Sequence, residues 1–276
     1  MDFNDLIFPC PKPSYNETLG GLYYIDEQIC GQSVKNSNEL KIQNGTIKVT
    51  IGQNQPHHKV IKRRRIVTLL QLEQKLNKGI VVFFHANAED LGMCKSLAFL
   101  LGIDLDMASI SIEYPGYGIY KGICSSDTMI KDGYQVMEHI IKVLKVQEEK
   151  IIIIGRSIGC SVAIEMSIRY RKIRSLILLS AFTSICDVIK ENSFFWLSKL
   201  VKERFRNLEK MHKVVCPTLF IHGKDDNLVN YQHSIELMKE CQGLVHIELF
   251  EGMNHNQFSI ESHIISPIKQ FLMKIK

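Results

Sequence analysis

Three side chains in this sequence have the types and the order of a nucleophile, an acid and a base. Ser157 lies in the pattern G-R-S-I-G, Asp226 ends the pattern H-G-K-D-D, and His255 lies in E-G-M-N-H-N. A serine hydroxyl is a poor nucleophile at neutral pH, so it needs a base to take its proton and an acid to hold that base. The sequence therefore predicts nucleophilic catalysis by Ser157, with His255 as the base and Asp226 as the acid.

The residues around Ser157 predict a sharp turn between a strand and a helix. Residues 151–154 are four consecutive isoleucines, which is typical of a strand buried on both faces of a parallel sheet. After the turn the apolar residues follow a helical spacing, with Ile158, Val162 and Met166 on one face. This is the context in which G-x-S-x-G forms a nucleophile elbow that exposes the serine hydroxyl.

The acid and the base are expected at the same edge of the sheet as Ser157. Residues 217–223 and 245–250 read as strands, and Asp226 and His255 follow them closely. Parallel strands present their chemistry at their carboxyl ends, so these loops should meet. Asp225 is a competing candidate for the acid. Three other histidines, His85, His222 and His246, are expected to have local hydrogen-bonding or packing roles.

A tetrahedral oxyanion needs two backbone N–H donors. The residue after the nucleophile, Ile158, is expected to supply one of them. The second should come from the loop that follows the buried strand at residues 79–84, where Asn87 is the first choice and Ala86 the second.

Strand and helix patterns alternate from residue 79 to the end, which predicts an α/β fold with a mostly parallel sheet and helices on both faces. Residues 1–38 contain prolines and a Gly-Gly pair and are expected to be irregular. Residues 39–276 are expected to form a single domain. Apolar stretches within 39–52 and 60–70 suit antiparallel strands that open the sheet.

The composition is that of a soluble globular protein, with 45% hydrophobic and 23% charged residues and a net charge of +5. This charge permits contact with an anionic membrane surface without requiring it. The basic run at 62–65 is expected to be a solvated strand face, so nucleic-acid binding is not predicted. The 8 cysteines form no C-x-x-C pair and lie at no metal-ligand spacing from histidine, which predicts reduced thiols, an intracellular protein and no metal. We expect neither a secretory signal nor a membrane span.

These motifs resemble those of the alpha/beta-hydrolase-domain proteins, a group that includes protein depalmitoylases and relatives described as serine peptidases. The resemblance covers roughly residues 79–275 and is carried by five ordered motifs: H-A-N-A-E-D-L-G, E-Y-P-G-Y-G, G-R-S-I-G, H-G-K-D-D and E-G-M-N-H-N. Where the family has glycine in H-G-N, this chain has Ala86, whose methyl group could crowd the turn that presents the oxyanion donor. The depalmitoylases also carry an acylated N-terminal cysteine cluster, whereas this chain has only Cys10 there, so stable membrane anchoring is not implied.

The resemblance implies an alpha/beta-hydrolase fold. Residues at about 182–213 break the alternation of strands and helices and are expected to form a short lid over the site. Within the lid, Phe194, Phe195 and Trp196 either hold the acyl chain of a substrate or pack the lid on the core. The implied activity is cleavage of acyl esters or thioesters, with an S-acyl (palmitoyl) protein as the favoured substrate and no cofactor. The expected location is cytoplasmic, with peripheral contact at a membrane surface.

Two alternatives remain open at this point. A serine peptidase or a small-ester carboxylesterase would use the same triad and oxyanion hole, because these groups serve acyl transfer in general. A non-catalytic binding protein on a hydrolase scaffold is the alternative from another class, with Ala86 as the lesion. The sequence predicts no particular oligomeric state.

Overall fold

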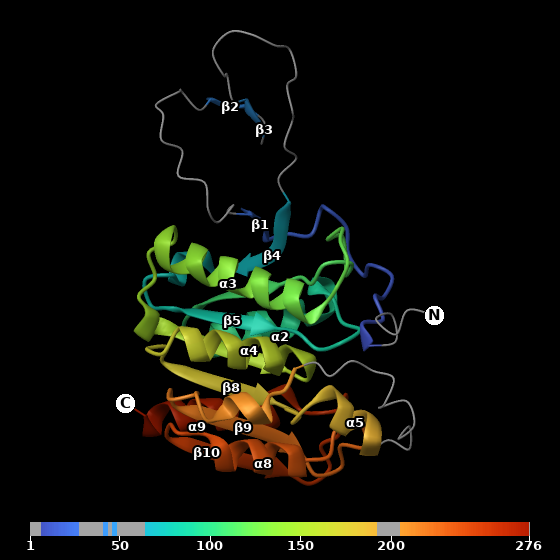
Figure 1. The fold of residues 1–276 in the computed structure, drawn as a ribbon. Coiled ribbons are helices and arrows are strands. Elements are labelled where there is room, and N and C mark those ends of the chain that lie inside the picture. The colour runs from blue at the N-terminus through green and yellow to red at the C-terminus, as the bar shows by residue number, and fades with distance from the viewer. Residues whose placement is uncertain (1–6, 28–40, 44–45, 49–63, 192–204, 276) are drawn as a thin grey trace.

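The centre of the molecule is an eight-stranded sheet in the order β1-β4-β6-β5-β7-β8-β9-β10 (Figure 1). The computed structural model describes residues 7–27, 41–43, 46–48, 64–191 and 205–275. The strands of this sheet are β1 (Leu22–Asp26), β4 (Arg65–Gln71), β5 (Ile80–Phe84), β6 (Ala108–Ile112), β7 (Ile151–Arg156), β8 (Ser175–Leu179), β9 (Thr218–Gly223) and β10 (Val245–Phe250). Neighbouring strands in the part of the sheet ordered β6-β5-β7-β8-β9-β10 run parallel to each other. Strand β4 is antiparallel to both of its neighbours, β1 and β6. The predicted mostly parallel sheet is therefore confirmed.

Both faces of the central strands are covered. Every residue of β5, β6, β7 and β8 is buried, and successive side chains of a strand point to opposite faces. The helical elements are η1 (Glu73–Lys75), α2 (Leu91–Asp104), α3 (Ser126–Lys142), η2 (Glu148–Lys150), α4 (Ile158–Arg169), α5 (Ile185–Glu191), α7 (Leu208–Met211), α8 (Gln232–Glu240), η3 (Ile260–Ile265) and α9 (Ser266–Lys274). Helix α4 packs on β7 and β8 and lies beside α3, whereas α2 packs on β4, β5 and β6 (Figure 1).

Polar side chains fix where two of these helices begin. The Asp90 carboxylate accepts a hydrogen bond from the Met93 N–H at 3.0 Å and caps α2. At α3, Ser125 and Thr128 form a reciprocal capping box. The cap at Asp90 matters for the site, because it anchors the loop that follows β5.

The N-terminal part of the chain differs from the prediction. Within the supposedly irregular segment 1–38, β1 pairs along its whole length with β4. Its residues, L-Y-Y-I-D, are good strand formers, but the Gly-Gly pair and the prolines before them hid the strand. The stretch 39–52 contributes β2 (Lys41–Gln43) and β3 (Thr46–Lys48), which pair only with each other rather than opening the main sheet.

The lid predicted at about residues 182–213 falls in the chain between β8 and β9. Its two ends are described, as α5 and α7, and residues 192–204 lie outside the described part. The predicted pocket residues Phe194, Phe195 and Trp196 therefore also lie outside it. Among the described residues, no disulfide joins two cysteines, no helix is long and apolar enough to cross a membrane, and no group of three or more metal-ligating side chains converges.

Candidate active site

Ser157 occupies a strained turn between β7 and α4. Its backbone has φ 51° and ψ −118°, in the left-handed half of φ space that side chains with a Cβ rarely adopt. The two glycines of the pentapeptide make this turn possible. A Cβ on Gly155 would lie 2.6 Å from the Cys160 Cα, and one on Gly159 would collide with the backbone carbonyl of Phe84 on β5. Helix α4 can therefore begin directly behind the serine, as the nucleophile-elbow prediction required.

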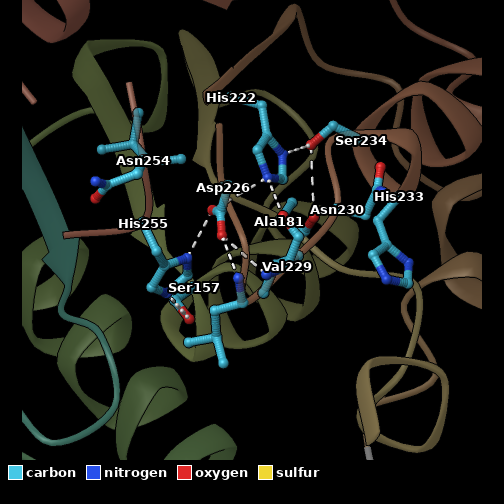
Figure 2. Close-up of polar contacts among 12 residues, drawn as sticks. Ser157, Ala181, His222, Asp226, Val229, Asn230, His233, Ser234, Asn254 and His255 are labelled. Atoms are coloured by element: carbon cyan, nitrogen blue, oxygen red, sulfur yellow. Dashed lines mark hydrogen bonds and ion pairs between the residues drawn. The ribbon is translucent and has the colours of Figure 1, made fainter. Parts of the chain in front are cut away.

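The structure brings Ser157, His255 and Asp226 into one hydrogen-bonded row (Figure 2). His255 Nε2 lies 3.1 Å from Ser157 Oγ, and His255 Nδ1 lies 2.7 Å from Asp226 Oδ2. All three residues are buried. Because the carboxylate can only accept, Nδ1 carries the proton and donates a hydrogen bond to Asp226, which leaves Nε2 as the acceptor for the serine hydroxyl.

Asp226 is held by donors on both of its oxygens. Oδ1 accepts from the N–H groups of Leu228 at 3.0 Å and Val229 at 2.9 Å, and Oδ2 accepts from His255. Burial by itself raises the pKa of Asp226, yet hydrogen bonds from His222, His255 and the Val229 N–H hold that pKa below its ordinary value. The carboxylate therefore stays ionised. The competing Asp225 instead accepts from the Gly252 N–H at 2.8 Å on the exposed side of the loop.

His222 supports the acid from behind. Its Nε2 lies 2.9 Å from the Val229 carbonyl oxygen and 3.4 Å from Asp226 Oδ2, and its Nδ1 lies 2.7 Å from Ser234 Oγ (Figure 2). Since Nε2 faces two acceptors, it carries the proton, and Nδ1 accepts from the Ser234 hydroxyl. The expected local role of His222 thus includes a contact with Asp226, the predicted acid.

The two expected oxyanion donors are available. Ile158 is the first residue of α4, so its N–H has no partner within the helix. Among the described residues, no hydrogen bond uses the N–H of Ile158 or of Asn87. The second choice, Ala86, is excluded because its N–H donates to Glu89 Oε2 at 3.0 Å. Ala86 is also absent from the residues with positive φ, so its backbone conformation is one that a residue with a Cβ readily adopts.

The loop after β5 is tied to the N-terminal segment. The Asn87 side-chain amide donates to the Ile7 carbonyl at 2.8 Å, and its amide oxygen accepts from the Tyr117 hydroxyl at 2.7 Å. The Tyr15 hydroxyl donates to the buried Glu113 carboxylate at 2.7 Å. These contacts join segments that no local sequence pattern connects.

Behind the loop, the fully buried His85 pairs with Glu113 at 3.1 Å. Burial lowers the pKa of His85, but the hydrogen bond to Glu113 and its charge raise that pKa more. The other ring nitrogen lies 2.9 Å from the Ala86 carbonyl oxygen, so His85 has the local hydrogen-bonding role that was expected. His246, expected to be packed, instead has a partly exposed side chain that pairs with Glu248 at 2.8 Å on β10.

Comparisons with known proteins agree with this architecture. Residues 123–255 match the family described as serine hydrolase (FSH1). The chain is 27% identical over 269 residues to the alpha/beta hydrolase domain-containing protein aho-3 of Caenorhabditis elegans, covering 97% of this chain and 76% of that protein. It is 28% identical over 200 residues to the human alpha/beta hydrolase domain-containing protein 17B, covering 71% of this chain and 66% of that protein.

Solved structures of similar fold are esterases and related hydrolases. The Pyrococcus furiosus esterase Pf2001 superposes with a TM-score of 0.62 at 16% identity, over 78% of this chain and 89% of that chain. The mouse alpha/beta hydrolase domain-containing protein 10 superposes with a TM-score of 0.56 at 18% identity, over 77% and 95% of the two chains. At these identities the likeness shows the fold, and it confirms the predicted alpha/beta-hydrolase architecture.

Proposed function

Because the chain is a serine hydrolase with the alpha/beta-hydrolase fold, we propose that Ser157, His255 and Asp226 form its catalytic triad. The observation that carries this proposal is the row of short contacts from the Asp226 carboxylate through His255 to the Ser157 hydroxyl. The free N–H groups of Ile158 and Asn87 are the proposed oxyanion hole. Their place at the end of β7 and in the loop after β5 supports this assignment.

The proposed reaction proceeds in two acyl-transfer steps. His255 Nε2 takes the proton of the Ser157 hydroxyl as the serine oxygen attacks the acyl carbonyl, and Asp226 stabilises the imidazolium that results. The oxyanion is held by the two N–H donors, which act mainly on the transition state. His255 then protonates the leaving thiol or alcohol. A water molecule, deprotonated by the same imidazole, attacks the acyl-enzyme, so that the carboxylic acid leaves and the serine is restored.

The proposed substrate is an S-acyl (palmitoyl) protein. The five ordered motifs that resemble the protein depalmitoylase group support this choice. We also propose that the enzyme works in the cytoplasm, with peripheral contact to the membrane that holds its acylated substrate. Fractionation of cells that express the tagged protein tests that location, and recovery from a secreted or lumenal fraction would count against it.

Two experiments test the proposal. A fluorophosphonate probe should label the wild-type protein and leave folded Ser157→Ala unlabelled, and absence of wild-type labelling would favour the non-catalytic binding protein. Turnover should then be compared for a palmitoyl-thioester peptide, a short-chain ester and a peptide amide. Preference for the thioester supports the proposed substrate, preference for the short ester indicates a carboxylesterase, and preference for the amide indicates a peptidase.

A further inference from the structure

Arg156, the first of the two variable residues of the G-x-S-x-G pentapeptide, joins loops that carry different parts of the proposed machinery. Its side chain is only 7% exposed. Arg156 Nη2 donates to the His255 carbonyl oxygen at 2.7 Å and to Asn256 Oδ1 at 3.1 Å, while Nη1 forms an ion pair with Glu89. The guanidinium also lies over the Phe258 ring, 5.0 Å from its centroid. One buried cation thus connects the loop after β10 with the loop after β5.

Glu89 passes this connection on to the oxyanion loop. One of its carboxylate oxygens pairs with Arg156, and the other accepts from the Ala86 N–H at 3.0 Å. The Ala86 peptide immediately precedes the residue whose N–H is the proposed second oxyanion donor, Asn87. The orientation of that donor therefore depends on a carboxylate that is itself held by the cation beside the nucleophile.

We infer that Arg156 and Glu89 are a positioning pair that fixes the Asn87 N–H relative to His255 and Ser157. The inference rests on the proposed function, because it assigns the pair a role in that same site. Neither side chain is expected to touch the substrate. Their contribution is to keep an oxyanion donor and the general base in register, and a misplacement of about 1 Å in such groups costs about 100-fold in rate.

The guanidinium geometry is part of the inference. Arg156 uses separate nitrogens for its contacts on the two loops, and a planar guanidinium presents several donors in a fixed fork. A lysine ammonium keeps the charge but lacks that fork. Arg156→Lys should therefore remain folded with the positive charge in place and still lose part of the activity.

The test is a double-mutant cycle on hydrolysis of p-nitrophenyl butyrate, with Glu89→Gln, Arg156→Gln, the double variant and Arg156→Lys. We expect each single Gln variant to lose about 10- to 100-fold in kcat with KM within about threefold of wild type. Because the two residues act as one unit, their losses should not multiply. The kcat of the double variant should lie within about threefold of the kcat of the less active single variant. Asp132→Asn is the control, because it breaks another buried ion pair, with Arg64, away from the triad and should leave kcat unchanged.

Each result has one interpretation. A kcat within about twofold of wild type in the folded single variants would overturn the inference, and so would losses that multiply in the double variant. If a Gln variant does not fold, Arg156→Lys decides, since unchanged kcat in that variant also overturns the inference. Probe labelling of wild-type Ser157 is measured first. Unlabelled wild-type protein refutes the proposed function, whereas labelled protein with unaffected variants refutes only the positioning pair.

Discussion

Replacing Asp226 by asparagine should invert the proton pattern of the proposed triad without removing a side-chain atom from the core. Oδ1 of Asp226 accepts two backbone N–H groups, from Leu228 and Val229. In Asp226→Asn the amide oxygen must keep that position, because an NH₂ group there would face two donors. The amide nitrogen therefore takes the Oδ2 position and donates to His255 Nδ1.

This forced orientation sets the size of the effect. With Nδ1 as an acceptor, the neutral imidazole carries its proton on Nε2, 3.1 Å from Ser157 Oγ, and cannot accept the serine proton. His255 is buried, so solvent cannot easily replace the missing base. We expect kcat to fall by about 10³- to 10⁴-fold, equivalent to about 4 to 5.5 kcal/mol of transition-state stabilisation. KM should change little, because Asp226 is not expected to touch the substrate.

The assay is steady-state hydrolysis of p-nitrophenyl butyrate near neutral pH, and thermal unfolding checks that each variant is folded. Asp225→Asn is the matched control: its carboxylate binds the Gly252 N–H and does not contact His255, so kcat should stay within about threefold of wild type. The tautomer argument is refuted if folded Asp226→Asn retains kcat within about tenfold of wild type. A large loss in Asp225→Asn with little loss in Asp226→Asn would reassign the acid.

Three further predictions concern stability. Gly159→Ala places a methyl group against backbone carbonyls at the end of β5, so it should lower the free energy of unfolding by about 3 kcal/mol or more, measured by urea unfolding; wild-type stability would contradict the tight elbow. Tyr15→Phe removes a donor from the buried Glu113 carboxylate and should cost about 1.5 to 3 kcal/mol in the same assay, and a loss below about 0.5 kcal/mol would show that the contact is dispensable. Burial raises the pKa of Asp132, and the charge of Arg64 lowers it. The effect of burial is larger, so the pKa rises from 3.8 to about 6. The native state therefore keeps this proton at pH values where the unfolded chain loses it, and the free energy of unfolding should fall by about 2 kcal/mol as the pH rises from about 4 to about 6. Asp132→Asn should remove this part of the pH dependence, and an identical pH dependence in both proteins would contradict the argument.

The sequence predicted the central strands well because their signal is strong and local. Strands β5, β7 and β9 coincide with the apolar runs identified in the sequence, and strands buried on both faces need such runs. Strand β1 lacked that signal because it is short and only Ile25 of its five residues is buried. The pairing of β2 with β3 alone, apart from the main sheet, also has no local signature.

The candidate site was predictable for a related reason. Ser157, Asp226 and His255 each follow a parallel strand, so their convergence follows from topology once the strands are recognised. Arg156 and Glu89 were both inside motifs that the sequence analysis quoted, yet neither received a role. Their pairing spans 67 positions and depends on how two loops are packed, which no spacing rule encodes. The pattern G-x-S-x-G treats the second residue as free, and that hid a functional candidate.

The buried ionisable pairs at this edge of the sheet favour an organisation for function rather than for stability. Three pairs follow strand ends there: His255 with Asp226, Arg156 with Glu89, and His85 with Glu113. Taking charges out of water is costly, and well-packed apolar replacements of such pairs are often neutral or stabilising. A fold selected only for stability gains little from placing three of them side by side. If these pairs serve geometry, replacing Arg156 and Glu89 together by glutamine, which keeps hydrogen-bonding groups near the His255 carbonyl and the Ala86 N–H, should change the melting temperature little while kcat falls. A variant that loses stability but keeps kcat would show the opposite.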